Sequence, residues 1–297
     1  MMAARRQRSL AGWVQLYASL VRYSSAHNCD FAREHYAFFS ALQARLQSYA
    51  GDLRGRRIVD VGCGKSAWLT LLLHSYGAQV TGIDTEFVSP RRTPRKYWNL
   101  ARSNGPERAL RTLAWDLVYA RPYYRALAAL CPFTLRFDDL DTRQMSATAL
   151  DLPTASFDVV VSHEAFEHIP DVPAAVQALR RLLKPAGVTY IYVHNFTSLS
   201  GGHHIEWKYP DTNPSQIVPP WDHLRENRFP DIPSWVNRWR EADYRHAFEA
   251  AFEILEWVPS ANEGKALLTA EIRRELSDYS DAELLTKGFV IIARPRT

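Results

Sequence analysis

Two carboxylates and two imidazoles stand within seven residues, 163 to 169, in the stretch SHEAFEHIPD that directly follows the apolar run FDVVV. If a helix begins here, the side chains of Glu164, Glu167 and His168 fall at positions i, i+3 and i+4 and share one face. Two neighbouring carboxylates repel each other unless a cation lies between them, and oxygen ligands with one imidazole suit Mg²⁺ or Mn²⁺. The spacing therefore predicts a helical face that binds a divalent cation and needs a further ligand from elsewhere in the chain.

A second pair of imidazoles, His203 and His204 in GGHHIEW, follows the next predicted strand. Loops at the carboxyl ends of neighbouring parallel strands converge, so either histidine is a candidate for the missing ligand. The alternative is that the first stretch only caps or solvates a helix. In that case the general base would be one of His163, His168, His203 and His204, because a near-neutral pKa suits proton removal from an alcohol.

A nucleoside site is indicated by the stretch RRIVDVGCG, residues 56–64. A strand that closes on Gly62 and Gly64 allows the backbone to turn sharply and to approach a ligand, because glycine lacks a Cβ. The next predicted strand ends at Asp84, whose carboxylate can accept both ribose hydroxyl protons. Gly62, Gly64 and Ala67 also satisfy GxGxxG/A, so an NAD-dependent oxidoreductase and a non-catalytic nucleoside-binding module stay open as alternatives.

Four segments in order, VDVGCG, GID, LDLPTASFDVVVSHEAFEHIPD and LRRLLKPAGVTYIYV, resemble the motifs of class I S-adenosylmethionine-dependent methyltransferases of the small-molecule type. The resemblance covers about residues 56 to 195. It departs from the family at Ser66, where relatives usually have a third glycine, and at Thr148, where many have an Asp that faces the adenine amino group. The resemblance places these residues at the cofactor: Asp60, Gly62, Cys63 and Gly64 at the methionine moiety, Asp84 at the ribose, Ser146, Ala147, Thr148 and Ala149 at the adenine edge, with Thr85 and Ser162 as further contacts.

The ExxEH pattern with a distal histidine also resembles the metal site of metal-dependent small-RNA 2′-O-methyltransferases and of some ubiquinone-pathway O-methyltransferases. That resemblance implies a divalent ion that coordinates the acceptor hydroxyl and is bound by Glu164, Glu167, His168 and either His203 or His204. Coordination would lower the pKa of that hydroxyl and aim its oxygen at the sulfonium methyl group for in-line displacement. The expected reaction is O-methylation, with S-adenosylmethionine as the methyl donor and Mg²⁺ or Mn²⁺ as a metal cofactor.

Several aromatic residues stand next to cationic residues in the sequence. Such a combination can bind a sugar, a phosphorylated glycan or a nucleotide, and these are therefore the classes of methyl acceptor considered. Packing is the commoner role of a single tryptophan, so most of these side chains are interpreted as core or cap residues. The stretches NFTSLSGGHH and VPPWDHLR resemble bacterial methyltransferases of glycan or glycolipid synthesis, which favours a saccharide hydroxyl. RNA is the competing class, but acids interrupt the basic residues throughout. The residues concerned are Trp207, Trp221, Trp235, Trp239, Tyr97, Trp98, Tyr123, Tyr124, Arg91, Arg92, Arg95 and Lys96.

Alternating strands and helices supply the elements that must position these residues, and a parallel sheet covered by helices follows from the pattern. We expect a doubly wound α/β fold with seven strands, the last one reversed as the resemblance implies. We divide the chain into an N-terminal helical segment (1–50) and a methyltransferase domain (51–297), with a helical cap insertion at about 86–143 and a substrate loop at about 196–240. His194, inside a strand, is interpreted as structural. Strands are expected at 56–61, 78–84, 157–162, 187–195, 253–259 and 287–295, and helices at 31–50, 66–77, 172–185, 242–252 and 269–286.

Composition is that of an ordinary globular protein, with 297 residues, 46% apolar content and a formal net charge of +4. That charge is too small to imply wrapping by nucleic acid. The cysteines Cys29, Cys63 and Cys131 are widely spaced and form no CxxC pair, which favours a reducing, cytoplasmic compartment over a disulfide framework.

No apolar run in the sequence approaches the ~18 residues that a membrane-spanning helix needs, so we expect no transmembrane segment. An amphipathic helix is expected from Leu10 to Val21, after the basic residues Arg5, Arg6 and Arg8. Packing on the domain is its favoured role, and peripheral attachment to a membrane surface is the alternative.

Overall fold

The protein is described by a computed structural model that covers residues 28–89, 92–208, 210, 214–229 and 235–296. The amphipathic helix expected near the N-terminus and Arg91 lie outside the described residues. The chain divides into two compact units. The first comprises the residues up to Arg56 together with Cys63–Met145, and the second comprises Arg57–Gly62 together with Ser146–Thr297.

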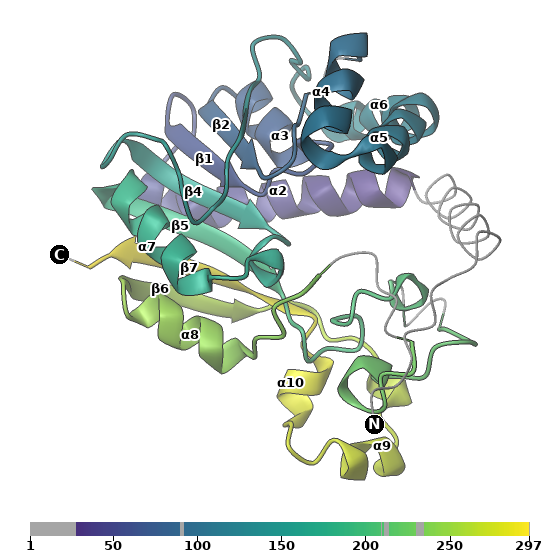
Figure 1. Ribbon diagram of the computed structural model, residues 1–297. Coiled ribbons are helices and arrows are strands. Elements are labelled where there is room, and N and C mark those ends of the chain that lie inside the picture. The colour runs from purple at the N-terminus through teal and green to yellow at the C-terminus, as the bar shows by residue number, and fades with distance from the viewer. Residues whose placement is uncertain (1–27, 90–91, 209, 211–213, 230–234, 297) are drawn as a thin grey trace. The chain divides into compact units, whose positions relative to one another are not determined.

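Within the described residues, seven strands form one mixed sheet in the order β3-β2-β1-β4-β5-β7-β6 (Figure 1). β2 pairs with β3, β1 with β4 and β4 with β5 in parallel, whereas β7 runs antiparallel to both β5 and β6. The doubly wound sheet with a reversed last strand, expected from the sequence, is confirmed. The strands are β1 (Arg57–Val61), β2 (Gln79–Asp84), β3 (Asp141–Gln144), β4 (Phe157–His163), β5 (Leu183–His194), β6 (Phe252–Pro259) and β7 (Gly288–Pro295).

In the second unit, β4 lies between β1 and β5 and has no exposed apolar residue from Val159 to Val161. A strand buried on both faces needs apolar side chains where it is covered, which explains the run Val159–Val161; Asp158, just before it, is only partly buried. α7 begins where the Asp171 carboxylate accepts the amide of Ala174, and its stripe from Val172 to Leu182 is buried. The helices of this unit are η1 (Phe166–His168), α7 (Val172–Leu182), η2 (Ile205–Trp207), η3 (Asp222–Leu224), α8 (Glu241–Glu249), η4 (Lys265–Leu267), α9 (Ala270–Glu275) and α10 (Asp281–Leu285).

In the first unit, α2 packs against α3 and α6, and α3 packs against β2. Gly82 of β2 allows that last contact, because a Cβ there would lie 2.6 Å from Oγ1 of Thr70 in α3. No described helix combines the length and apolar content needed to cross a membrane. The helices are α2 (Asn28–Ala50), α3 (Trp68–Tyr76), α4 (Pro94–Asn104), α5 (Pro106–Val118) and α6 (Ala120–Leu130).

Two sequence-based expectations were wrong in detail. The interval 86–143 is largely helical, as its composition predicts, but its end overlaps β3, whose polar sequence DTRQ gives no strand signal. The single helix expected at 269–286 is two short helices, because Ser280 starts a new one by accepting the amide of Glu283 while the Glu283 carboxylate accepts the Ser280 amide.

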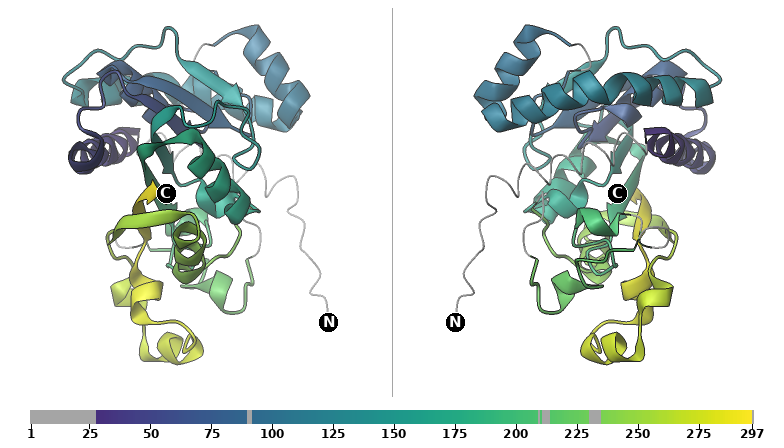
Figure 2. Two further views of the ribbon diagram at one scale, coloured as in Figure 1. Left: turned by 90° about the vertical axis from the view of Figure 1, so that its left-hand side faces the viewer. Right: turned by 90° about the vertical axis from the view of Figure 1, so that its right-hand side faces the viewer.

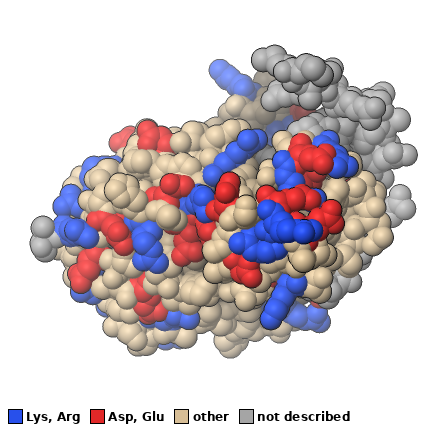
Figure 3. Space-filling model, turned by 90° about the horizontal axis from the view of Figure 1, so that it is seen from below, with Lys and Arg blue, Asp and Glu red and all other residues tan. Residues whose placement is uncertain are grey.

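The irregular segment after β5 shares a small hydrophobic core with the C-terminal helices. Trp207 and Trp221 are its largest side chains, so these two tryptophans are core residues as interpreted from the sequence. On the face drawn in Figure 3, Lys and Arg are interspersed with Asp and Glu, and no field of one sign dominates there. The buried members of the small core are Leu199, Trp207, Val218, Trp221, Ile272, Leu276 and Leu284.

Candidate functional site

The turn that follows β4 is not the helix expected at 163–169. Only Phe166–His168 form a short 3₁₀ helix, and Glu164 has a left-handed φ of 50°. The reason lies in the sequence beyond the turn: Pro170 disfavours a helical conformation of Ile169, which is extended, and the next helix begins only after Asp171. Glu164 therefore does not share a helical face with Glu167 and His168.

Three of the expected metal ligands nevertheless meet. One ligand atom from each of Glu167, His168 and His203 lies within 4.8 Å of the other two. The structure thus brings His203 to the turn after β4, whereas Glu164 and His204 are not part of this group. We call Glu167, His168 and His203 the acid–histidine cluster.

The His168 ring is oriented by the backbone. Its Nδ1 lies 2.6 Å from the carbonyl oxygen of Trp235. A carbonyl can only accept a hydrogen bond, so Nδ1 carries the proton and Nε2 keeps a free lone pair. That is the tautomer a metal-binding imidazole needs. The rings of His168 and His203 meet edge to face, with centroids 4.9 Å apart.

Glu167 is the most unusual group of the cluster, since its side chain is 1% exposed. No described residue gives either of its carboxylate oxygens a hydrogen bond of ordinary geometry. Burial, and then the charge of Glu164, raise the pKa of Glu167 well above its ordinary value, and the nearby amides of Glu167 and His194 only partly oppose this. A buried carboxylate without partners is costly, and a bound cation would remove that cost.

Glu164 differs from Glu167, because its side chain is 42% exposed. Desolvation acts to raise the pKa of Glu164, but its electrostatic interactions with His163, His194 and nearby lysines outweigh desolvation and hold the pKa below its ordinary value. Glu164 therefore adds negative charge close to the cluster.

His203 is held in place by a chain of buried polar groups. It has a left-handed φ of 57°, and its amide donates to the Ser200 carbonyl over 2.9 Å. The amide and the hydroxyl of Ser200 both donate to Oε1 of Glu263 over 2.7 Å. Because the Ser200 hydroxyl donates to Glu263, it accepts a hydrogen bond from the Nε2–H of His194 at 2.8 Å. His194 is thus a structural residue, as expected from the sequence, and its ring lies 4.9 Å from that of His203.

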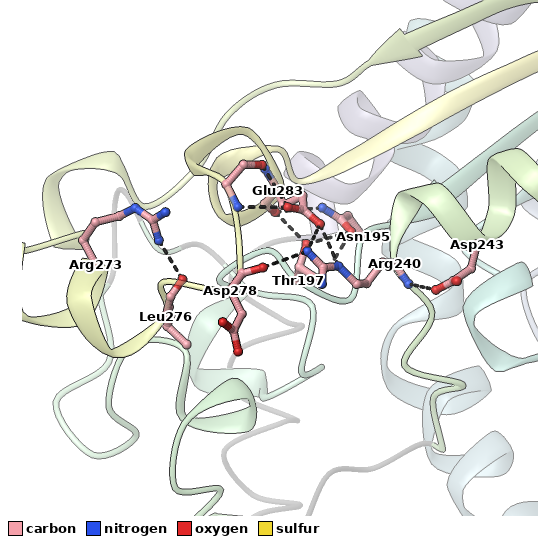
Figure 4. A network of polar contacts seen from close by, with 9 residues as sticks. Asn195, Thr197, Arg240, Asp243, Arg273, Leu276, Asp278 and Glu283 are labelled. Atoms are coloured by element: carbon pink, nitrogen blue, oxygen red, sulfur yellow. Dashed lines mark hydrogen bonds and ion pairs between the residues drawn. The ribbon is translucent and has the colours of Figure 1, made fainter.

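The start of the same loop is anchored to α10. Figure 4 shows Glu283 between Asn195, Thr197 and Arg240. The Asn195 amide and the Thr197 hydroxyl donate to the Glu283 carbonyl, at 2.9 and 2.7 Å, and the Arg240 guanidinium binds the Glu283 carboxylate. The loop that carries His203 is therefore fixed at Asn195, Thr197 and Ser200, although it has little regular structure.

Asn237 holds the other half of the cluster. Its amide nitrogen Nδ2 donates to the carbonyls of Phe166 and Ile169, at 2.9 and 3.0 Å, and its backbone N–H donates to the Glu167 carbonyl at 2.8 Å. Asn237 and Glu263 were both missed by sequence reasoning. Neither belongs to a motif, and each acts through contacts with residues far away in the chain.

The other candidate bases lie around the cluster. His163, at the end of β4, stacks on Tyr192 with ring centroids 5.1 Å apart, and burial lowers its pKa. His204 is buried. His223 was not among the candidates identified from the sequence. Its Nε2 lies 2.9 Å from the Phe196 carbonyl oxygen and donates a hydrogen bond to it, because a carbonyl can only accept.

The glycine turn has a different role at each glycine. In the second unit, a Cβ on Gly62 would lie 2.3 Å from Cβ of Ala165, so Gly62 allows the turn after β4 to pack against the end of β1. Asp60 of β1 is buried, and the Ser162 hydroxyl donates to the Val61 carbonyl at 2.8 Å. These residues lie where the β1 and β4 strands end, and their contact with a cofactor stays a prediction.

In the first unit, Gly64 has φ of 64° and no atom within 4 Å of the position where a Cβ would lie. Its amide donates to one carboxylate oxygen of Asp84 at 2.9 Å, and the Glu86 amide donates to the other at 2.8 Å. Each oxygen keeps a second lone pair, so Asp84 can still accept hydrogen bonds from two hydroxyls. Cys63 is buried beside these residues, and the Thr85 carbonyl accepts the Gln144 side-chain amide.

The four residues expected at the adenine edge form a tight turn. Ser146 and Ala149 pair in an isolated antiparallel bridge, and the hydroxyls of Ser146 and Thr148 lie 2.8 Å apart. Ala147 is half-buried between them. Thr148 thus keeps a polar atom at the position where many relatives have an Asp, but that atom is already bonded to a neighbour.

The aromatic residues considered for the acceptor fall into two groups. Tyr123 is buried, and Lys96 forms a buried ion pair with Asp116 at 2.7 Å, so these two serve the interior of the helical insertion. Trp98 and Trp235 are 70% and 57% exposed. Trp235 is the one that contacts the cluster, through its carbonyl bond to His168.

Known proteins resemble this chain in sequence and in fold. The model of a family described as a methyltransferase domain matches residues 31–256. The ubiquinone biosynthesis O-methyltransferase of Bordetella avium is 30% identical over 150 residues, which are 50% of this chain and 47% of that protein. The protein of the same name from Xanthomonas oryzae pv. oryzae is 32% identical over 146 residues, 49% of this chain and 46% of its own length. The chain thus spans about half the length of the curated relatives it matches.

Among solved structures, an S-adenosylmethionine dependent methyltransferase from Mesorhizobium loti is 18% identical and has a TM-score of 0.46, with 84% of this chain and 96% of that chain covered. The PH0226 protein from Pyrococcus horikoshii OT3 is 15% identical with a TM-score of 0.48, and 89% of this chain and 92% of that chain are covered.

Proposed function

Because this chain belongs to the methyltransferase domain family, we propose that it transfers the methyl group of S-adenosylmethionine to a hydroxyl oxygen of a small molecule. Its similarity to ubiquinone biosynthesis O-methyltransferases supports oxygen as the methyl acceptor. The acid–histidine cluster after β4 and β5 supports it further, since a cation-binding group is of use to a hydroxyl that must lose its proton.

The residues proposed to bind the donor have the chemistry that it needs. Asp84 has lone pairs left for the ribose hydroxyls, and the space beside Gly64 is open. Asp60 and the turn Gly62–Gly64 would bind the methionine moiety, Thr85 would assist at the ribose, Ser146–Ala149 would contact adenine, and Ser162 would be a further contact. Backbone groups and small side chains dominate this set, as expected where a ligand lies close to the main chain.

We propose that Mg²⁺ or Mn²⁺ binds Glu167, His168 and His203, and the observation that carries this is the partnerless, buried carboxylate of Glu167 beside two imidazoles. A bound divalent ion would lower the pKa of the acceptor hydroxyl and position its oxygen. His168 is already in the ligand tautomer, and Glu164 raises the negative charge nearby. If no ion binds, His163, His168 or His204 would take the proton as general base.

For the acceptor we propose a saccharide hydroxyl. The exposed indole of Trp235 supports this, because it belongs to the residue whose carbonyl binds His168, and a flat aromatic face can stack on the apolar face of a sugar ring. A phenolic acceptor is the competing class, favoured by the names of the relatives.

Calorimetry and a transfer assay test the proposal. We expect the protein to bind S-adenosylhomocysteine and not NADH, which would separate a methyltransferase from a nicotinamide enzyme. With labelled S-adenosylmethionine, transfer to a panel of glycosides should exceed transfer to catechols and to RNA. EDTA should abolish transfer, and added Mg²⁺ or Mn²⁺ should restore it. Full activity in EDTA would disprove the cation and leave histidine catalysis, whereas NADH binding alone would disprove the methyltransferase.

A further inference from the structure

Helix α5 leaves an apolar face uncovered. Leu110, Ala114, Leu117 and Val118 follow the spacing i, i+4, i+7 and i+8, which places them on one side of the helix. All four are exposed, Leu110 to 66%. A surface helix of a water-soluble domain normally has the opposite arrangement, with its apolar stripe turned to the core.

The buried face of α5 is the more polar one. Its buried residues are Ala109, Thr112 and Asp116. Asp116 accepts hydrogen bonds from Lys96 at 2.7 Å and from Tyr97 at 2.8 Å, and both of these partners belong to α4. Figure 2 shows α4 and α5 lying against each other in both views. The two helices are therefore joined by a buried ion pair, while the apolar side chains of α5 point outward.

Exposed arginines lie on both helices that pack against α5, while α5 itself has one exposed acid, Glu107, in its first turn. On α4, Arg95, Trp98 and Arg102 are exposed at positions i, i+3 and i+7. On α6, which starts two residues after α5 ends, Arg121 and Arg125 are exposed. The only acids in residues 92–130 are Glu107 and Asp116, and Asp116 is buried with Lys96.

We propose that the exposed face of α4, α5 and α6 binds the surface of an anionic phospholipid membrane, with Leu110, Leu117, Val118 and Trp98 among the acyl-chain boundary and the arginines at the phosphates. An apolar stripe flanked by arginines is what such a surface attracts, and an indole is favoured at the boundary between headgroups and acyl chains. None of the described helices could span the bilayer, so the contact is peripheral. This surface is separate from the proposed methyl transfer and does not depend on it.

Two other occupants fit the face less well. A second copy of this chain would bring the same arginines together, and like charges at an interface oppose association. Single-stranded nucleic acid would match the arginines, but it is bound by several aromatic side chains that stack on successive bases, and this face combines one exposed indole, Trp98, with the aliphatic Leu110, Leu117 and Val118.

Vesicle co-sedimentation of the full chain tests the membrane proposal. We expect binding to vesicles of phosphatidylcholine with phosphatidylglycerol, little binding to phosphatidylcholine alone, and weaker binding as salt is raised. The double variant Leu110→Ser/Leu117→Ser should lose most of the binding. Arg121→Ala and Arg125→Ala should each weaken it about fivefold, the usual contribution of one arginine near an anionic surface.

Matched controls are available in the second unit. Ile217 is as exposed as Leu110, and Arg274 of α9 is an exposed arginine, so Ile217→Ser and Arg274→Ala should bind vesicles as the unchanged protein does. Circular dichroism and S-adenosylhomocysteine binding report whether each variant is folded. Three results would overturn the proposal: equal binding to neutral and anionic vesicles, dimerisation that the leucine variants abolish, or binding to single-stranded oligonucleotides in preference to vesicles.

Discussion

The hydroxyl of Ser200 donates to Oε1 of Glu263 over 2.7 Å, and both residues are buried. The Ser200 amide donates to the same oxygen, while the Ser200 carbonyl accepts the His203 amide. Glu263 therefore fixes the turn at which His203 adopts its left-handed conformation, and a residue outside the cluster controls where one of its imidazoles lies.

Replacing Glu263 tests this positioning. A hydrogen bond to a charged group contributes about 1.5–3 kcal/mol, and Glu263→Ala removes two of them, so the turn should no longer hold His203 in one place. We expect kcat to fall about tenfold or more, with the dissociation constant of S-adenosylhomocysteine unchanged. Glu271→Ala, which removes an exposed carboxylate from α9, is the control. An equal loss of cofactor affinity would instead assign Glu263 to the overall fold.

Glu167 should limit the stability of the metal-free protein. Glu167→Gln keeps the shape of the side chain but cannot ionise. The free-energy cost of ionising a buried carboxylate without partners is therefore removed, and the melting temperature in EDTA should rise. The same variant should lose cation binding by about 100-fold or more, since even residues that only support a metal ligand cost about 10–100-fold. Differential scanning calorimetry with and without Mn²⁺ measures both effects.

Glu164→Gln is the matched control for Glu167, because Glu164 is half-exposed and lies outside the cluster. It should weaken Mn²⁺ binding only modestly, through the loss of a nearby charge. If Glu164→Gln were the more damaging of the two substitutions, the ligand set of Glu167, His168 and His203 would be wrong.

Asn237 should matter for the cation and not for the methyl donor. Asn237→Asp removes both Nδ2 donors and sets a carboxylate against the carbonyls of Phe166 and Ile169, which loosens the turn that carries Glu167 and His168. We expect weaker Mn²⁺ binding by calorimetry and an unchanged affinity for S-adenosylhomocysteine. Asn262→Ala, at an exposed asparagine, should change neither. A loss confined to cofactor binding would contradict this assignment.

Gly62 and Gly64 should respond differently to the same substitution. Gly62→Ala sets a methyl group against Ala165 in addition to straining a left-handed φ, so the free energy of unfolding should fall by about 2–5 kcal/mol. Gly64→Ala meets open space and should lose only about 1–2 kcal/mol, but should weaken S-adenosylhomocysteine binding. Urea unfolding and calorimetry separate the two. The double variant Gly62→Ala/Ala165→Gly should recover the part due to the clash, and no recovery would refute the packing argument.

Acid should destabilise the protein through His223. Burial is the main cause that lowers its pKa from 6.5 to about 3. As the pH falls below 6.5, the unfolded chain takes up this proton and the folded protein does not, so stability present above pH 6.5 is lost at about 1.4 kcal/mol per pH unit. His223→Gln should flatten the decline of the urea midpoint between pH 6.5 and 5.

The sequence predicted the sheet well because its strands are apolar on both faces. Val159–Val161 and Phe289–Ala293 are unbroken apolar runs, and both lie in buried strands. β3 was missed because DTRQ has no apolar residue. The turn after β4 was expected to be helical because Glu164, Glu167 and His168 have helical spacing, whereas Pro170 disfavours a helical conformation of the residue before it.

The sequence predicted that three of the proposed ligands lie close together, and their binding of a metal stays a prediction; the residues that hold them in place were not predicted. The types and places of Glu167, His168 and His203 follow from the rule that loops at strand ends converge. Asn237 and Glu263 act through bonds to Phe166, Ile169 and Ser200, across separations of about 60 to 70 residues. Such contacts depend on tertiary structure and cannot be predicted from the spacing of residues in the sequence.

The small core beneath the loop after β5 bears on how relatives of this chain would diverge. Trp207 and Trp221 pack against Ile272, Leu276 and Leu284, so the loop that carries His203 shares its interior with α9 and α10. A substitution that reshapes the loop can be compensated by a change of side-chain volume in those helices while the glycine turn stays as it is. A change of acceptor during evolution would accordingly leave its trace in the last quarter of the chain, in paired substitutions at residues that never touch the substrate.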